Sequence, residues 1–253
     1  MPLSSAMDQF YVGNTPLVAL YAGDQKIWPS GFTPNSLSGL VTWLDAAEYS
    51  TGSWPNKASG PAVTLPGTPA PTVSANTLNG KPLVRFKGNE GKVRSVWETN
   101  PVEWTLIYLT RWIGPNPGRA FSVQYPPSNL LVGMHTSQPD TMYNNGTWMV
   151  YGTGWNGWTI GTTNPWRMYG ADSTQSVGSR FFIDGMEIGT PVFNVGAQEG
   201  LYGGWGLSGY GAGNEETLDI EVAELVLYNR KLSDVDREQV EEYLRQKWGV
   251  GFS

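Results

Sequence analysis

The sequence contains no cysteine and only one histidine, His135. Disulfide bonds, thiol catalysis and thiolate metal sites are therefore excluded, and a Ser-His-Asp triad or a histidine-rich zinc site has little support. Lysine and arginine form no run, and the net charge of −6 disfavours a nucleic-acid partner, which would need a clustered basic face. No apolar stretch reaches the roughly 18 residues of a membrane span. The first ten residues lack the basic start and apolar run of a signal peptide, so we expect synthesis in a cytoplasm without signal-directed secretion.

Charged residues are also scarce, at 15% of the 253 residues. Glycine (32), proline (18), tryptophan (12) and tyrosine (12) are abundant, and hydrophobic residues still reach 40%. Few charges with many turn-forming and aromatic residues are typical of short strands joined by many turns. The composition therefore predicts an all-β protein with a sizeable core.

A short internal repeat occupies the first thirty residues. Residues 10–14 (FYVGN) are echoed by residues 20–24 (LYAGD), and each Gly-Asn or Gly-Asp is a turn signal between apolar runs. We predict a β meander of about three strands at 1–29, a linker at 30–36 and one β-sandwich at 37–253. Such a small meander is only marginally stable on its own in water. It either folds back on the main domain or serves as an attachment module, whose contact residues would be Tyr11, Val12, Tyr21, Ile27 and Trp28.

The main domain shows strand patterns and one helix. An Asp-Gly pair at 184–185 between apolar runs predicts a hairpin, and a switch of alternation near Val222 and Ala223 predicts a bulge or burial of both faces. Ser233 is placed to cap a helix that Gly249 ends. We expect this helix to cover one end or edge of the sandwich.

Four segments carry a resemblance to a known family. They are residues 37–46 (LSGLVTWLDA), 78–86 (LNGKPLVRF), 182–188 (FIDGMEI) and 223–233 (AELVLYNRKLS) followed by the helix. Together they resemble the concanavalin A-like, laminin-G-like jelly-roll domains of bacterial and phage proteins. The resemblance implies a laminin-G-like jelly-roll β-sandwich with a short N-terminal β segment and one C-terminal α-helix.

The N-terminal repeat resembles segments that open minor tail proteins of bacteriophages. This resemblance implies a non-enzymatic virion protein, assembled in the host cytoplasm as a minor tail or tail-tip component. Its partners would be other virion proteins, copies of itself in the particle, and a host-surface glycan. One alternative is a capsid decoration protein without a receptor role, and another is a β-glucan hydrolase.

The glucanases of this superfamily carry a Glu-x-Asp-x-Glu run on one strand. The corresponding residues 217–221 (TLDIE) keep Asp219 and Glu221, but Thr217 stands where the nucleophile would be. Because retaining hydrolysis needs both carboxyl groups, we expect no enzyme activity. Glu224, at the family's Ala-Glu position, is interpreted as a structural carboxylate, and His135 as a solvent-facing or loop histidine.

We expect no cofactor, although calcium remains an open alternative because laminin-G-like domains often bind it. The oxygen-bearing loop residues that could serve are Asp140, Asn144, Asn145, Asp172 and Asn214.

Residues 143–166 are rich in aromatic, asparagine and glycine residues. Sugars stack on aromatic rings while amides bind their hydroxyl groups, so a glycan site is one interpretation, beside core packing and a protein interface. Trp155, flanked by glycine and asparagine, is the residue that we expect to be most exposed. The candidate ligand-binding residues are Trp155, Trp158, Trp148, Tyr151, Asn145 and Asn156.

Overall fold

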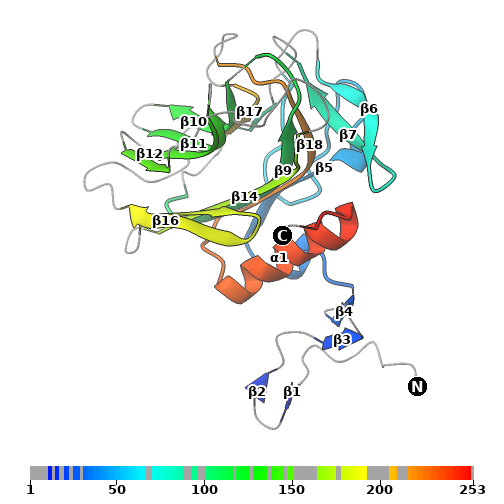
Figure 1. Ribbon diagram of the computed structural model, residues 1–253, viewed down its shortest axis with the longest axis vertical. Helices are drawn as coiled ribbons and strands as arrows, with labels where there is room; N and C mark the ends of the chain where they lie inside the picture. The colour runs from blue at the N-terminus through cyan, green and yellow to red at the C-terminus, as the bar shows by residue number, and fades with distance from the viewer. Residues whose placement is uncertain are drawn as a thin grey trace. The chain divides into compact units, whose positions relative to one another are not determined.

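The computed structural model forms two compact units, residues 1–33 and residues 34–253 (Figure 1). The boundary falls inside the segment predicted as a linker. The structure describes residues 11–12, 15–16, 20–22, 25–28, 31–65, 70–87, 93–95, 101–116, 118–125, 128–135, 138–144, 147–150, 164–174, 178–192, 205–209 and 216–251.

The N-terminal unit contains two antiparallel strand pairs. β1 (Tyr11–Val12) pairs with β2 (Thr15–Pro16), and β3 (Leu20–Ala22) pairs with β4 (Gln25–Trp28). The internal repeat therefore gives four short strands in two hairpins rather than one meander of three. The residues proposed for attachment lie on these strands, and their role remains a prediction.

The second unit is an antiparallel β-sandwich, which confirms the predicted fold class (Figure 1). The smaller sheet runs in the order β13 (Thr147–Val150), β12 (Gln138–Asn144), β11 (Ser128–His135), β10 (Arg119–Tyr125), β17 (Trp205–Leu207) and β8 (Val93–Ser95). The larger sheet runs in the order β16 (Met186–Val192), β15 (Gly178–Ile183), β14 (Arg167–Thr174), β9 (Trp104–Trp112), β18 (Ile220–Tyr228), β7 (Lys81–Phe86) and β6 (Thr72–Leu78), and β5 (Leu40–Asp45) also pairs with β18. Two short 3-10 helices, η1 (Pro34–Ser36) and η2 (Ala46–Glu48), flank β5.

Aromatic rings fill the space between the two sheets. Tyr108 lies 5.6 Å from Tyr169 and 6.2 Å from Phe121, between ring centroids. Phe121 stacks on Trp205 at 5.5 Å, and Tyr169 stacks on Phe181 at 6.1 Å. All five rings are buried. Stacked and tilted aromatic pairs of this kind add stability beyond the area they bury, so these five rings are part of the core.

β18 is a central strand of the larger sheet, and a bulge within it determines which strands it pairs with. The register between β18 and β9 shifts between Val222 and Glu224, which confirms the predicted bulge. Residues 220–222 pair with β7, whereas residues 224–228 pair with β5. All nine residues of β18 are buried. The bulge allows β18 to pair with β7 and then with β5 along the same edge, and both faces of β18 are covered.

The predicted hairpin is also confirmed. β15 ends at Ile183 and β16 begins at Met186, so Asp184 and Gly185 form a two-residue turn. Both turn residues have positive φ, 55° and 91°, which is the geometry that Asp-Gly accommodates best.

The helix α1 (Asp234–Trp248) begins and ends where its capping residues predict. The Ser233 hydroxyl accepts a hydrogen bond from the backbone N–H of Asp236, and Gly249 adopts the left-handed conformation with φ 63°. The expected position of the helix was wrong, however. α1 lies along the outer face of the larger sheet rather than at an end or edge of the sandwich (Figure 1).

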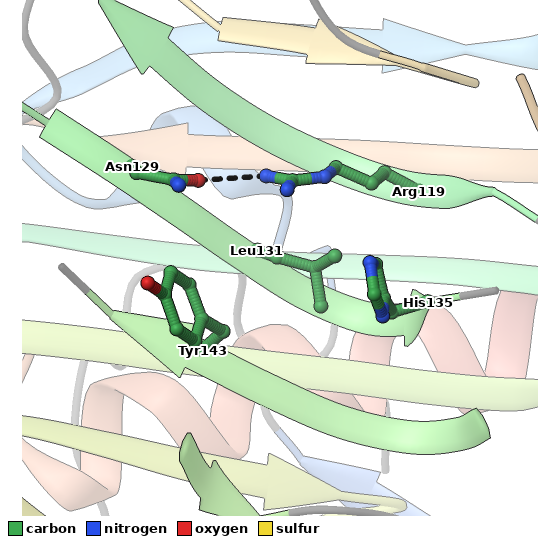
Figure 2. A pocket seen from close by; sticks show the side chains of 5 residues that line it. All are labelled: Arg119, Asn129, Leu131, His135 and Tyr143. Carbon is green, nitrogen blue, oxygen red and sulfur yellow. Dashed lines mark hydrogen bonds between the residues drawn. The ribbon is translucent and has the colours of Figure 1, made fainter. Parts of the chain in front are cut away.

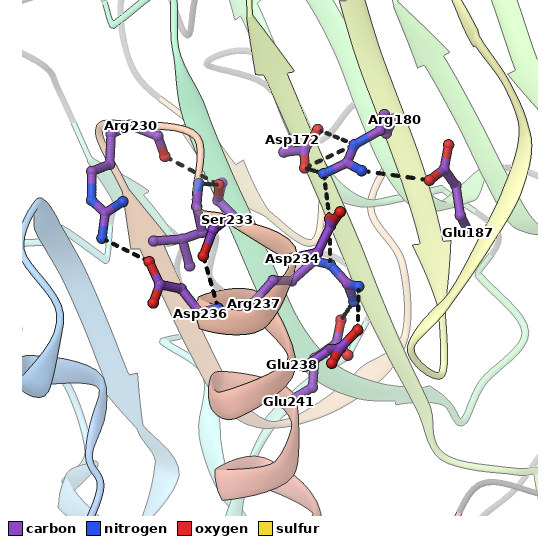
Figure 3. A network of polar contacts seen from close by, with 12 residues as sticks. Asp172, Arg180, Glu187, Arg230, Ser233, Asp234, Asp236, Arg237, Glu238 and Glu241 are labelled. Atoms are coloured by element: carbon purple, nitrogen blue, oxygen red, sulfur yellow. Dashed lines mark hydrogen bonds and ion pairs between the residues drawn. The ribbon is translucent and has the colours of Figure 1, made fainter. Parts of the chain in front are cut away.

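A polar network holds the first turns of α1 on that sheet (Figure 3). Arg180 on β15 binds Asp172 on β14 through its Nε and Nη2 groups and reaches Asp234 at 3.0 Å. Arg237 pairs with Glu241 one turn further along the helix, and both side chains are buried. The helix is therefore fixed by ion pairs as well as by its apolar residues.

Candidate functional site

A cavity of about 260 Å³ opens on the smaller sheet. Its described lining comes from three neighbouring strands, β10, β11 and β12 (Figure 2). The lining residues are Arg119, Asn129, Leu131, His135 and Tyr143.

The strand register brings these residues to one place. Arg119 lies directly opposite His135 across β10 and β11, and Leu131 lies opposite Tyr143 across β11 and β12. Asn129 and Leu131 are two residues apart on β11 and so share a face. Leu131 is fully buried and lies between the rings of Tyr143 and His135 (Figure 2).

A small charge network surrounds the cavity. The Arg119 guanidinium forms an ion pair with Glu216, which lies just before β18, and donates a hydrogen bond of 2.7 Å to the Asn129 side-chain oxygen. The Nε2 atom of His135 lies 3.5 Å from the other Glu216 oxygen. One cation and one anion thus balance each other at the cavity.

His135 is not the solvent-facing or loop histidine expected from sequence. It ends β11, and its side chain is only 16% exposed. Burial lowers the pKa of His135 below its usual 6.5, and the Arg119 cation acts in the same direction, although Glu216 opposes both. The imidazole is therefore predominantly neutral at pH 7.

The arrangement favours binding of a small polar molecule with an apolar face. The half-buried Tyr143 ring supplies apolar surface beside the buried Leu131, while the Asn129 carboxamide and the Arg119 guanidinium lie within reach. An aromatic wall beside convergent polar groups is the pattern by which proteins hold sugar rings.

The glucanase-like run lies on the larger sheet, and its carboxylates have structural partners. Asp219 accepts a hydrogen bond of 2.9 Å from Asn116. The fully buried Glu221 forms an ion pair with Arg111 at 2.6 Å and also binds Ser74 and Asn76. Glu221 thus ties β18 to β9 and β6 through side-chain contacts.

Glu224 is a structural carboxylate, as interpreted from the sequence, and its partners are side chains. It is fully buried and accepts hydrogen bonds from the indole N–H groups of Trp43 and Trp248, at 2.6 and 2.7 Å. The ammonium group of Lys247 lies 2.6 Å away, and the Tyr243 hydroxyl lies 3.1 Å away. Glu224 thus joins β5, β18 and the last turns of α1.

Two of the aspartates considered for calcium are paired with arginines. Asp140 accepts a hydrogen bond from the Tyr169 hydroxyl at 2.7 Å and lies 3.5 Å from Arg167. Asp172 is bound by Arg180. Asn145 and Asn214 lie outside the described residues, as does the side chain of Asn144. Within the described part of the chain, no group of three or more acidic or histidine side chains could hold a metal ion.

The aromatic stretch predicted to bind glycan lies mostly outside the described residues. Asn145, Tyr151, Trp155, Asn156 and Trp158 all lie there, and Trp148 belongs to β13 without a described side chain. At the end of the stretch, Trp166 is half-buried beneath the guanidinium of Arg111, 4.9 Å from the ring centre. Apart from Tyr143, where the stretch begins, the lining residues of the cavity were not predicted. They are scattered over 25 positions and form no motif.

Three solved structures show the fold that this chain is similar to. Trypanosoma rangeli sialidase in complex with sialic acid is 15% identical with a TM-score of 0.54, over 83% of this chain and 33% of the sialidase. Domain 4 of AbnA, a GH43 extracellular arabinanase from Geobacillus stearothermophilus in complex with arabinotriose, is 13% identical with a TM-score of 0.55, over 80% and 97% of the two chains. The binding domain of Botulinum neurotoxin DC in complex with rat synaptotagmin II is 12% identical with a TM-score of 0.59, over 84% and 52%.

These likenesses establish a shared β-sandwich fold. The chain spans about a third of the length of the sialidases that it matches. No family model and no curated protein matches the sequence. Among the described residues, no helix is long and apolar enough to cross a membrane.

Proposed function

We propose that this chain is a non-enzymatic glycan-binding component of a bacteriophage virion, of the minor tail or tail-tip type. The observation that carries the binding role is the cavity on β10, β11 and β12, with an apolar floor, an aromatic wall and convergent polar groups. Its size and lining suit part of a carbohydrate.

Two further observations support the proposal. A domain of similar fold, domain 4 of the arabinanase AbnA, has been solved in complex with arabinotriose, and the match covers 97% of that domain. The N-terminal repeat resembles segments of phage minor tail proteins, and it forms a compact unit that could serve as an attachment module.

The binding role is tested with purified full-length protein and intact host cells. Fluorescently labelled protein should bind the cells, and Tyr143→Ala should reduce binding at least tenfold because it removes the aromatic wall. Met186→Ala is the matched control, since Met186 is 61% exposed on the larger sheet and is not a lining residue of the cavity. Equal binding by wild type and Tyr143→Ala would contradict the proposal.

The virion role needs a separate experiment. Mass spectrometry of purified particles should detect the chain, and cryo-electron microscopy should place a few copies at the tail tip with the cavity facing outward. A regular array of copies over the capsid shell would instead assign a decoration role. Absence of the chain from the particles would overturn the virion assignment altogether.

A further inference from the structure

We propose that the cavity holds a single uncharged pyranose residue, at an end of a glycan, and discriminates against acidic sugars. This inference rests on the proposed glycan-binding function and specifies its ligand class. It comes from the charge balance, the size and the chemistry of the lining.

The charge balance argues against an acidic sugar. The one permanent cation of the described lining, Arg119, is already paired with Glu216. His135 also faces Glu216 and is predominantly neutral at pH 7, because burial lowers its pKa. A ligand carboxylate beside Arg119 would therefore meet the Glu216 carboxylate as well, and repulsion would offset the attraction of the guanidinium. The protein's net charge of −6 adds no compensating field.

The size argues for one sugar ring. The volume of about 260 Å³ corresponds to roughly nine water molecules at about 30 Å³ each. It lies just below the range of about 300 to 1,000 Å³ that is usual for drug-sized ligands. One hexose ring fits this space, whereas a longer oligosaccharide would extend beyond it. The cavity therefore recognises one residue of a glycan, and a terminal residue enters with the least obstruction.

The lining chemistry suits an uncharged ring. The C–H face of a pyranose can pack on the ring of Tyr143, which stands next to the buried Leu131 across β11 and β12. The polar groups on the other side of the cavity, Asn129 and Arg119, are already joined by a hydrogen bond of 2.7 Å, so their positions are fixed before a ligand arrives (Figure 2). Preorganised polar groups of this kind can bind sugar hydroxyls at little entropic cost.

The test uses the full chain and individual methyl glycosides. Saturation-transfer NMR would be recorded with methyl glucoside, galactoside and mannoside as neutral probes, and with galacturonic acid and N-acetylneuraminic acid as acidic probes. We expect transfer to at least one neutral probe and at least tenfold weaker binding of both acids. In Tyr143→Leu, which keeps an apolar side chain, the neutral signal should fall severalfold at an unchanged melting temperature.

Glu216→Gln gives the sharpest readout. This variant removes the carboxylate that compensates Arg119, so the ratio of acidic to neutral binding should rise at least tenfold. Glu48→Gln, which removes an exposed carboxylate of η2, is the matched control and should leave the ratio unchanged. If Glu216→Gln does not fold, the same ratio is measured on wild type at rising ionic strength, where the ratio of acidic to neutral binding should increase because salt screens the repulsion between Glu216 and a ligand carboxylate.

The outcomes separate this inference from the proposed function. Tighter binding of an acidic probe by wild type would overturn the neutral-sugar assignment but leave glycan binding intact. Host-cell binding that depends on Tyr143, without transfer to any monosaccharide, would overturn the single-residue assignment alone. Loss of both, with no probe bound and no Tyr143-dependent cell binding, would overturn the proposed function as well.

Discussion

Replacing Glu224 with glutamine tests whether one buried carboxylate joins the helix to the larger sheet. Glu224 is fully buried and is surrounded by four donors, from Trp43, Tyr243, Lys247 and Trp248. Burial raises the pKa of Glu224, while Lys247 and the Trp43 indole oppose that rise. Glutamine has nearly the same shape, but its amide group would turn N–H donors toward an indole N–H or an ammonium group.

The magnitude follows from the number and type of interactions that remain. Removing one partner of a buried ion pair costs about 3 to 5 kcal/mol in the free energy of unfolding. Lys247 keeps a second carboxylate here, because Asp45 lies 2.6 Å from its ammonium group. We therefore expect the lower end, about 3 kcal/mol, for Glu224→Gln. For a domain of this size that loss corresponds to a melting temperature lower by about 6 to 12 °C.

Denaturant unfolding followed by tryptophan fluorescence provides the assay. Glu48→Gln is the control, since its carboxylate is 53% exposed and lies 3.7 Å from its lysine partner, and it should change stability by less than about 0.5 kcal/mol. Glu224→Gln should also expose Trp248, which shifts the emission of the native state if α1 loosens. A loss below about 1 kcal/mol would refute the reasoning that this carboxylate fastens α1 to the sheet.

Three further predictions concern other parts of the chain. Gly133→Ala should lower the free energy of unfolding by about 3 kcal/mol or more, since a Cβ there would lie 2.1 Å from the Tyr108 hydroxyl at a φ of 105°. Gly52→Ala, with a φ of 83° in open space, should lower it by only about 1 kcal/mol. Denaturant unfolding compares the two variants. Because the folded-state pKa of His135 is lowered, its contribution to stability should be present above about pH 6.5 and be lost at lower pH. The free energy of unfolding should fall by at most about 1.4 kcal/mol per pH unit in that range. His135→Gln should reduce this slope of unfolding free energy against pH. Deleting residues 1–33 should leave the melting temperature of the sandwich unchanged but abolish incorporation into phage particles, and retained incorporation would contradict the attachment role.

Features set by neighbouring residues were predictable from the sequence. The ends of α1 follow from Ser233 and Gly249, whose capping effects act within one helical turn. The Asp-Gly hairpin and the bulge in β18 likewise depend on a few consecutive residues. Predicting the fold class required several such local signals, and all of them indicated the same β-sandwich. Agreement among local signals is the condition under which a sequence specifies one structure.

The position of α1 and the cavity could not be predicted in the same way. The helix lies on the face of the sheet because its residues meet partners that are remote in the sequence, such as Asp45, which binds Lys247 from 202 residues away. The cavity depends on the register that sets Arg119 opposite His135 and on a separate register that sets Leu131 opposite Tyr143. Such pairings are decided by the whole set of strand contacts, so no local pattern of residues indicates them.

The two outer faces of the sandwich use their polar groups differently, and the difference bears on function. On the larger sheet, Glu224 and Asp45 are covered by α1 and share Lys247, so their charges hold the helix on the sheet. On the smaller sheet, the Arg119–Glu216 pair stands beside a hollow of about 260 Å³. There Arg119 is held by both Glu216 and Asn129, so its guanidinium is fixed beside the hollow rather than beneath a helix. Ion pairs of the same kind therefore fasten a helix on one face and, on the other, fix polar groups beside a hollow, which is the arrangement that the proposed glycan site requires.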